Sequence, residues 1–304
     1  MALFKKKQND KILVASLEGQ QCRIQLFDCL TSPISQTVAK QFLFTDLAHL
    51  AEEFSASVKK HVPKGTLCRW MLSADHYQSH TVDAPNVSKN ELREALKWQI
   101  KELLDKPVDE MLISHYRPNH PDANYKQINA IAVEKDLVEN LIDITSKAGL
   151  ALDSIEIEEL CIGNALIDRL EDKVVGFVGE NSAGLIFNFY HQNELCFSRY
   201  KKGRYIPKQP SETELVLDDE LQAQEDSFLL ETQRTLDYVV SQIFRRPLDC
   251  IFLQNSNTNE KLAETMSQLT DIPVIWADLG IALGEGSQFS PSLAEAGCAK
   301  RLGA

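Results

Sequence analysis

The fold is decided by a stretch near the start of the sequence, Lys11-Ile12-Leu13-Val14-Ala15-Ser16-Leu17-Glu18-Gly19-Gln20-Gln21-Cys22-Arg23-Ile24-Gln25-Leu26-Phe27-Asp28. Its two apolar runs, residues 11–17 and 22–28, are rich in the residue types that favour β-strands. The polar residues between them include Gly19, which supplies the permissive backbone of a turn. The stretch therefore predicts a β-hairpin at one edge of a sheet.

Residues 37–75 extend this sheet. A third strand is expected at residues 37–43, and a short apolar strand at residues 67–72. Between them Asp46 occupies the N-cap position of a helix whose apolar residues recur at helical spacing. Three strands and a helix in this order predict a mixed sheet.

The same order of hairpin strands followed by helices is expected in the second half of the chain. A three-stranded meander is expected at residues 173–178, 184–190 and 194–201. After a polar, acidic linker, a long helix is expected from about residue 220 to residue 245, followed by shorter strands and helices up to a helix at residues 291–302. A hairpin sheet followed by helices, twice over, is the order of an α/β protein with two similar lobes.

Residues 76–147 have a different order of elements, which predicts an inserted subdomain. Ser88 and Glu91 have the spacing of a capping box. The helix behind them carries an apolar face, and two strands at residues 111–116 and 127–133 follow. A second helix ends at Gly149, which is expected as its C-cap glycine.

The composition excludes several classes of protein. The formal net charge of the 304 residues is −12, whereas a nucleic-acid binder presents a basic face. No stretch approaches the roughly 20 apolar residues of a membrane span, and no apolar core of a signal peptide follows the first lysines. The three lysines at positions 5–7 either contact an anionic membrane surface or belong to a solvated tail.

The cysteines and histidines indicate no metal site. The seven cysteines form no CxxC pair and are irregularly spaced, which predicts neither a disulfide framework nor a zinc site and fits a reducing cytosol. His76, His80, His115 and His120 are not joined by other ligands at metal-binding spacing, and we interpret them as surface residues.

The order of elements resembles the actin-like ATPase fold and, more narrowly, the PilM family of type IV pilus assembly proteins. The resemblance is carried by residues 91–99 with 105–111, by residues 129–135 with 148–150, and by two further stretches, Phe197-Ser198-Arg199-Tyr200-Lys201-Lys202-Gly203 and Pro291-Ser292-Leu293-Ala294-Glu295-Ala296-Gly297-Cys298-Ala299-Lys300-Arg301. Within the family, the branch that serves mannose-sensitive haemagglutinin (MSHA) pili is the most similar.

The resemblance implies a ribonuclease H-like, two-lobed α/β fold with an inserted 1C-type α+β subdomain in the first lobe. The first lobe would comprise residues 11–75 and 148–170, the inserted subdomain residues 76–147, and the second lobe residues 171–290. The helix of residues 291–304 would return to the first lobe, and residues 1–10 would form a flexible tail.

An actin-like nucleotide site needs two hairpin turns with an Asp-x-Gly core, whose carboxylates hold hydrated Mg²⁺ while the turn amides bind phosphate. By position, Ser16 replaces the first aspartate, Glu18 replaces its glycine, and Gly179 replaces the second aspartate. The glycine pair expected beside adenosine is replaced by polar residues at 254–257. Phosphoryl transfer depends on the lost charges, so we expect no ATP hydrolysis, no catalytic residue, and no resident cofactor or metal.

Weak nucleotide binding stays open as an alternative, with Glu18 and Glu180 as displaced substitutes for the missing carboxylates. The protein would then be an ATP-binding actin-like switch whose nucleotide state controls assembly. The residues expected to contact ATP and Mg²⁺ in that case are Ser16, Glu18, Gly19, Gln20, Glu180, Asn181 and Ser182.

The resemblance also implies a partner, the cytoplasmic tail of a PilN-like inner-membrane protein. In the family this tail lies in a groove between the first lobe and the inserted subdomain, where an extended peptide gains main-chain hydrogen bonds. The residues expected to contact it here are Leu96, Trp98, Ile100, Leu103, Leu104 and Ile131. The pilus assembly ATPase and a second copy of the chain are further expected partners, and membrane association would be peripheral.

The three tryptophans have different predicted places. Trp70 and Trp276 lie in expected strands and are interpreted as core residues. Trp98 lies off the apolar stripe of its helix, so it is either an interface residue or packed against a neighbouring strand.

Overall fold

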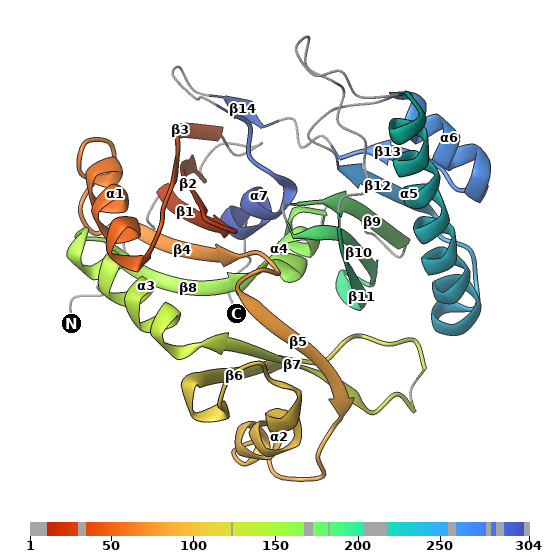
Figure 1. Ribbon diagram of the computed structural model, residues 1–304, viewed down its shortest axis with the longest axis horizontal. Helices are drawn as coiled ribbons and strands as arrows, with labels where there is room; N and C mark the ends of the chain where they lie inside the picture. The colour runs from red at the N-terminus through yellow and green to blue at the C-terminus, as the bar shows by residue number, and fades with distance from the viewer. Residues whose placement is uncertain are drawn as a thin grey trace, which may run out of the picture. The chain divides into compact units, whose positions relative to one another are not determined.

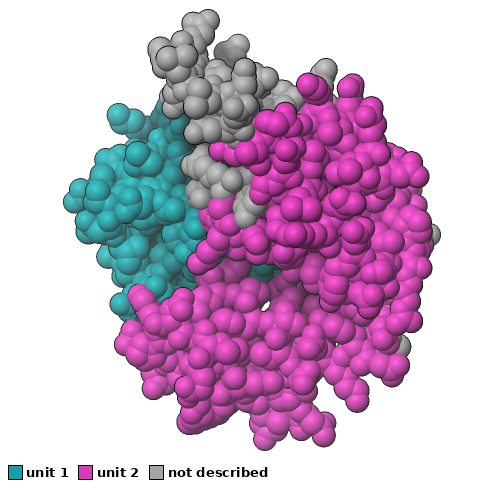
Figure 2. Space-filling model, turned by 45° about the vertical axis from the view of Figure 1, so that its right-hand side comes forward, with its two compact units in different colours: residues 1–76, 133–165, 279–304 teal, residues 77–132, 166–278 magenta. Residues whose placement is uncertain are grey.

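The computed structural model describes residues 11–29, 35–122, 124–166, 173–181, 183–203, 218–254, 260–277, 281–283 and 289–300. The predictions for the tail, for residues 207–217 of the acidic linker, for Ser182 and for residues 255–257 lie outside these ranges, and the last linker residues, 218–220, belong to a helix. The chain divides into two compact units (Figure 2). Unit 1 comprises Met1–His76, Val133–Ala165 and Leu279–Ala304, and unit 2 comprises Tyr77–Ala132 and Leu166–Asp278.

Unit 1 is built on a mixed sheet (Figure 1). Its strands, in spatial order, are β14 (Ala282–Leu283), β3 (Ser35–Leu43), β2 (Gln21–Asp28), β1 (Lys11–Glu18), β4 (Leu67–Leu72) and β8 (Ala151–Ile157). β1 and β2 form the predicted antiparallel hairpin, and β1, β4 and β8 are parallel. The expected mixed sheet is therefore confirmed.

Helices α1 (Leu47–Lys59) and α3 (Lys135–Lys147) pack around Trp70 on one face of this sheet. The ring of Trp70 stacks on Phe54 of α1 with centroids 4.9 Å apart, and its Nε1 donates a hydrogen bond to Thr145 Oγ1 of α3 at 2.8 Å. Trp70 is fully buried, which confirms its predicted core role. Asp46 caps α1 as predicted, because its Oδ1 accepts from the His49 amide at 2.9 Å.

The end of α3 has the geometry that the sequence predicted for Gly149. Gly149 has a φ of 75°, its amide donates to the Ser146 carbonyl, and the Leu150 amide donates to the Thr145 carbonyl. These two bonds form a Schellman motif, in which glycine favours the left-handed position. Because α3 packs with α1 and β8, it belongs to unit 1, whereas the sequence prediction placed it in the inserted subdomain.

Helices α4 (Glu158–Leu166) and α7 (Leu293–Lys300) also belong to unit 1. Arg69 of β4 is paired with Val14 of β1. Its guanidinium group donates to the carbonyl groups of Cys298 and Ala299 at the end of α7. Since Arg69 and Trp70 point to opposite faces of the strand, α7 lies on the face away from α1 and α3. Residues 301–304 of the predicted last helix lie outside the described ranges.

The first part of unit 2 is a three-stranded sheet covered by one helix. The strands lie in the order β5 (Tyr77–Asp83), β7 (Gln127–Glu134) and β6 (Met111–Tyr116). Helix α2 (Leu92–Ile100) is followed by 3₁₀ turns at Lys101–Leu103 and Val108–Glu110. The core between helix and sheet consists of Leu92, Leu96, Ile100, Met111, Ile113, Ile128, Ala130 and Ala132.

The predicted capping box forms only in part. Glu91 Oε2 accepts from the Ser88 amide at 3.2 Å as expected. The Ser88 hydroxyl, however, donates to the same carboxylate oxygen at 2.6 Å instead of accepting from the Glu91 amide, which bonds the Ser88 carbonyl. The loop is therefore closed by a turn, and α2 begins at Leu92, three residues after the start that a cap at Ser88 would give.

The second part of unit 2 is a sheet in the order β11 (Glu194–Lys202), β10 (Gly184–His191), β9 (Val174–Glu180), β12 (Cys250–Gln254) and β13 (Val274–Trp276). The predicted meander is confirmed. Helices α5 (Asp218–Tyr238) and α6 (Glu260–Thr270) accompany it, with Phe228 and Met266 in the shared core. The predicted long helix changes to a π-helix at Val239–Phe244, and Trp276 is only partly buried at the edge of this core.

Candidate functional site

The first candidate element is the turn between β1 and β2, where an actin-like protein holds phosphate. Ser16 stands in the place of the expected aspartate and is buried, with 2% of its surface exposed. Its Oγ donates to Glu295 Oε1 of α7 at 2.6 Å. The hydroxyl of Ser16 is therefore used to hold the helix, and it is turned toward the interior of unit 1.

Glu295 is a buried carboxylate with a complete set of partners. Its exposed fraction is 1%. Besides Ser16, its Oε2 lies 3.3 Å from Arg23 Nη2 and accepts from the Ser292 amide at 2.7 Å. Arg23 also donates to the Ser290 carbonyl and lies over the ring of Phe289. A buried charge of this kind is tolerated only when it is paired and hydrogen-bonded.

Glu295 is not among the residues predicted for the site, although the sequence carries a signal for its cap. Ser292 and Glu295 have the spacing of a capping box, and both reciprocal bonds form, since the Glu295 amide also donates to Ser292 Oγ at 3.2 Å. The cap was detectable from spacing alone. The contacts with Ser16 and Arg23 were not, because residues 16 and 295 are 279 positions apart.

The amide of Gly19 is already bonded to a carboxylate of the same chain. Gly19 has a φ of 55°, and its N–H donates to Asp75 Oδ2 at 3.2 Å. The loop after β4 is tied to the hairpin a second time, because the Ser73 amide donates to the Leu17 carbonyl at 3.0 Å. An incoming phosphate would have to displace Asp75 to reach this donor.

His76 lies in the loop after β4, beside this turn, and is partly exposed. Burial lowers the pKa of His76, while the Asp75 carboxylate and a hydrogen bond between its ring and the Gly19 backbone oppose that shift. Its Nε2 is buried and has no hydrogen-bond partner among the described residues. Of the other three histidines, His115 is exposed, and His80 and His120 are partly exposed.

The remaining predicted residues of the first turn are arranged along its rim. Glu18 ends β1 and is partly exposed, and it interacts with other groups of the protein. Gln20 is exposed, and its carbonyl accepts from the Phe44 amide at 2.9 Å. The turn is therefore held at both ends, by β3 and by the loop after β4.

The second turn, between β9 and β10, has its own internal cap. Asn181 Oδ1 accepts from the amides of Ala183 and Gly184 at 2.9 and 3.0 Å, and the Asn181 amide donates to the Gly184 carbonyl. A Cβ added at Gly179, the place of the second aspartate, would lie 2.7 Å from the ring of Phe177. Any side chain there requires that ring to move. Glu180 is partly exposed and interacts with other groups.

The two turns share a chemical property. In each, amides that could bind phosphate already donate to a side-chain oxygen, from Asp75 in the first and from Asn181 in the second. Over the described ranges, no group of three or more His, Cys, Asp or Glu residues could hold a metal ion.

The residues predicted to contact a partner peptide fall into two groups. Leu96 and Ile100 are fully buried in the core beneath α2, and Ile131 is 4% exposed. These three side chains have almost no exposed surface, so the prediction that they contact the partner is corrected. The apolar face of α2 packs against the three-stranded sheet of its own subdomain. Leu104 packs partly against the same core.

Trp98 and Leu103 are the exposed members of that set. Their exposed fractions are 68% and 52%, and the ammonium group of Lys101 lies 5.2 Å from the centre of the Trp98 ring. The end of α2 at Ile100 explains Leu103, because the following 3₁₀ turn rotates it away from the apolar face. Trp98 does not pack against a neighbouring strand, so that interpretation is wrong. Its aromatic side chain is exposed and can contact a partner.

The cysteines are free thiols, and all but Cys29 are buried. Burial raises the pKa of Cys22 and of Cys68, and it raises the pKa of Cys196 to about 12. These thiols remain protonated near neutral pH and act as small apolar side chains. None of the helices within the described ranges has the length and apolar character to cross a membrane.

No protein-family model matches the sequence, and no curated protein matches it either. Solved structures are similar across nearly the whole chain. A chain of a PilM–PilN type IV pilus biogenesis complex superposes with a TM-score of 0.70 at 14% identity, over 95% of this chain and 97% of that one.

Two other structures have a TM-score of 0.53. The cytoplasmic domain of EpsL, an inner-membrane component of the type II secretion system of Vibrio cholerae, is 9% identical and covers 95% of this chain and 94% of its own. A Bacteroides thetaiotaomicron protein with an actin-like ATPase fold is 11% identical and covers 90% of this chain and 93% of its own. The predicted fold class is confirmed: the chain has the two-lobed actin-like ATPase fold.

Proposed function

We propose that this protein is a cytoplasmic scaffold of a type IV pilus assembly machinery, of the MSHA type, that binds the cytoplasmic tail of a PilN-like inner-membrane protein. The observation that carries the proposal is the likeness to a chain of the PilM–PilN complex over 95% of the sequence. The likeness to the cytoplasmic domain of an inner-membrane secretion component supports the same location, at the inner face of that membrane.

The chemistry of the two turns supports a scaffold without ATP hydrolysis. Ser16 and Gly179 supply no carboxylate for hydrated Mg²⁺, and Asp75 and Asn181 take amide donors that phosphate would need. Without these groups, neither the metal nor the developing charge of phosphoryl transfer is stabilised. The protein then acts through binding, with the pilus assembly ATPase and a second copy of the chain as further proposed partners.

Within this proposal, Trp98 and Leu103 contact the tail. Both are exposed apolar side chains of the inserted subdomain, and large aromatic side chains contribute most strongly to peptide binding when a partner covers them.

Titration calorimetry with a synthetic tail of the PilN-like protein tests the proposal. We expect saturable binding that Trp98→Ala weakens by about tenfold, which corresponds to roughly 1.4 kcal/mol. Leu269→Ala is the matched control, because Leu269 is an exposed apolar residue of α6 in another part of the molecule. Absence of heat together with absence of co-elution would overturn the proposal.

The second candidate is an ATP-binding switch, and the actin-like fold itself favours it. In this case the residues predicted to contact ATP and Mg²⁺ are Ser16, Glu18, Gly19, Gln20, Glu180, Asn181 and Ser182, and the Ser16 hydroxyl would have to leave Glu295. We rank it second because binding at the first turn requires the Asp75 carboxylate to leave the Gly19 amide.

A further inference from the structure

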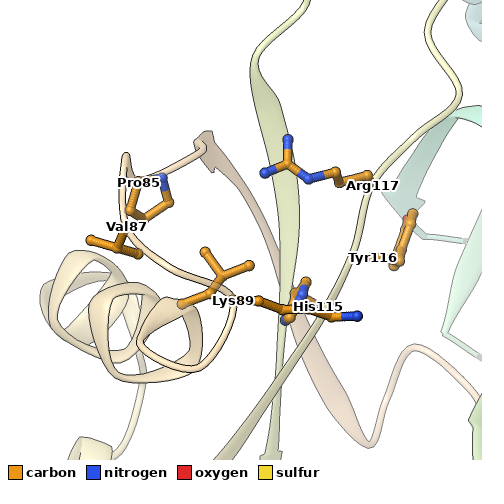
Figure 3. A pocket seen from close by; sticks show the side chains of 7 residues that line it. Pro85, Val87, Lys89, His115, Tyr116 and Arg117 are labelled. Atoms are coloured by element: carbon orange, nitrogen blue, oxygen red, sulfur yellow. The ribbon is translucent and has the colours of Figure 1, made fainter.

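The inserted subdomain contains an open cavity of about 470 Å³, whose lining includes no residue of the two turns and neither Trp98 nor Leu103. Its walls come from the loop between β5 and α2, from the first residue of α2 and from the end of β6. The lining residues are Pro85, Val87, Lys89, Leu92, His115, Tyr116 and Arg117. Figure 3 shows Pro85 and Val87 on one side of the cavity and Arg117 on the other.

The charge of this cavity is opposite to that of the chain. The chain carries a formal net charge of −12, yet the lining contains Lys89 and Arg117 and no aspartate or glutamate. Burial lowers the pKa of His115, and the positive charges of Arg117, Arg93 and Lys89 lower it further. With two cationic side chains and no carboxylate in its lining, the cavity has a local positive potential.

The walls of the cavity are held in place before any ligand arrives. The Ala84 amide donates to the Lys126 carbonyl at 2.7 Å at the start of the loop. At its end, Glu91 Oε2 accepts from the amide and the hydroxyl of Ser88, which occupies that carboxylate. Leu92 is anchored in the core of the subdomain. A preformed wall lowers the cost of ordering on binding.

The apolar side of the cavity decides what kind of anion fits. Pro85, Val87 and Leu92 contribute carbon surface beside the cations, and Val87 is 45% exposed. A free phosphate would satisfy the cations and leave these carbons in water. A carboxylate side chain next to an apolar side chain would cover both, because a peptide presents the two together.

We propose that this cationic cavity is a docking site for an acidic, apolar-flanked peptide segment of a protein partner. Arg117 and Lys89 bind its carboxylates, and Pro85, Val87 and Leu92 contact its apolar side chain. The site is separate from the surface of Trp98 and Leu103, so the scaffold holds two partners through one subdomain. This inference does not depend on the identity of the pilus partner.

Fluorescence anisotropy on the full chain tests the proposal with a labelled Glu-Leu-Glu-Leu peptide, blocked at both ends, and its neutral match Gln-Leu-Gln-Leu. We expect the acidic peptide to bind at least about tenfold more tightly and to weaken as salt rises. The double variant Lys89→Glu with Arg117→Glu should lose at least about tenfold in affinity. Both side chains are exposed, and a melting curve checks that the variant is folded; Arg117→Gln alone replaces it if it is not.

The matched control is Lys60→Glu with Lys147→Glu, which changes the net charge by the same amount at exposed lysines of unit 1. It should change the affinity by less than about twofold. Equal binding of the acidic and neutral peptides, or equal loss in the control, would overturn the proposal. Displacement of the peptide by inorganic phosphate as readily as by unlabelled peptide would reassign the cavity to small anions. Binding of the PilN-like tail should be unchanged in the double variant, which separates this outcome from the proposed function.

Discussion

At the scale of single residues, polar side chains of unit 1 occupy positions where an actin-like site would be built. Ser16 faces Glu295 and not the turn, and Asp75 bonds the Gly19 amide. The sequence predicted that the first aspartate is missing. The sequence could not predict the contacts that Ser16 and Gly19 make instead, because Glu295 and Asp75 come from distant parts of the chain.

Glu295→Gln should lower the free energy of unfolding by about 2 kcal/mol. The amide can still accept from Ser16, but its nitrogen faces Arg23 and the Ser292 amide, which are donors. Leaving such donors unpaired costs about 1–3 kcal/mol. Urea unfolding followed by circular dichroism measures the change. Glu53→Gln, at an exposed carboxylate 3.9 Å from His49, should shift stability by less than about 0.5 kcal/mol; a similar loss in both would contradict the assignment.

His76 makes stability depend on pH in a defined direction. Its folded pKa is lowered from 6.5, chiefly by burial, so the unfolded chain binds a proton first as the pH falls. Stability is therefore lost below about pH 6.5, and His80, His115 and His120 act in the same direction. Urea unfolding at about pH 7.5 and about pH 5.5 measures the loss. His76→Asn should lose less than the wild type between the two; an unchanged difference would show that His76 contributes nothing.

At the scale of elements, helix α7 packs very closely against α4 within unit 1. Gly297 lies against α4 so closely that an added Cβ would stand 1.8 Å from the Cys161 carbonyl oxygen and 2.8 Å from the Ala165 nitrogen. The pattern of residues 291–301 predicted a helix here. The need for glycine inside it follows only from the approach of a second helix backbone.

Gly297→Ala should therefore destabilise unit 1 by about 3 kcal/mol, because two helix backbones must separate to admit one methyl group. Thermal unfolding of the purified chain measures it. Cys298→Ala, which removes a buried atom from the same helix, should cost only about 1 kcal/mol. Equal effects would indicate that the helix contact tolerates expansion.

Element boundaries were predicted less well where tertiary contacts decide them. The periodicity of α2 continues to Leu104, yet the helix ends at Ile100 and leaves Leu103 exposed. The long helix of unit 2 becomes a π-helix at Val239–Phe244, where Ile243 and Phe244 are drawn into the core. Strands with alternating or apolar runs, such as β1 and β9, were predicted well because burial of their faces follows directly from their residue types.

At the scale of the whole molecule, an actin-like frame is retained while its two phosphate turns are closed by the protein's own side chains. The order of elements along the sequence was enough to predict the frame, because hairpins and helices are local.

We expect Mg²⁺-ATP to leave the melting temperature unchanged. A nucleotide at 100–1,000 times its dissociation constant would stabilise the fold by about 3–4 kcal/mol, which differential scanning fluorimetry detects easily. Asp75→Ala serves as the comparison, since it frees the Gly19 amide but leaves the second turn capped. A concentration-dependent rise in the wild-type protein would favour the ATP-binding switch over the scaffold.

The contacts of Glu295 with the first hairpin also have a consequence for how the chain folds during translation. The hydroxyl of Ser16 and the guanidinium group of Arg23 lie in the first hairpin, but their partner is translated 279 residues after Ser16. Domains generally fold in the order in which they leave the ribosome. Here the sheet of unit 1 keeps Arg23 without its Glu295 partner until residue 295 has been made. A ribosome that stalls before residue 295 therefore releases a chain in which the sheet of unit 1 lacks its contacts with α7.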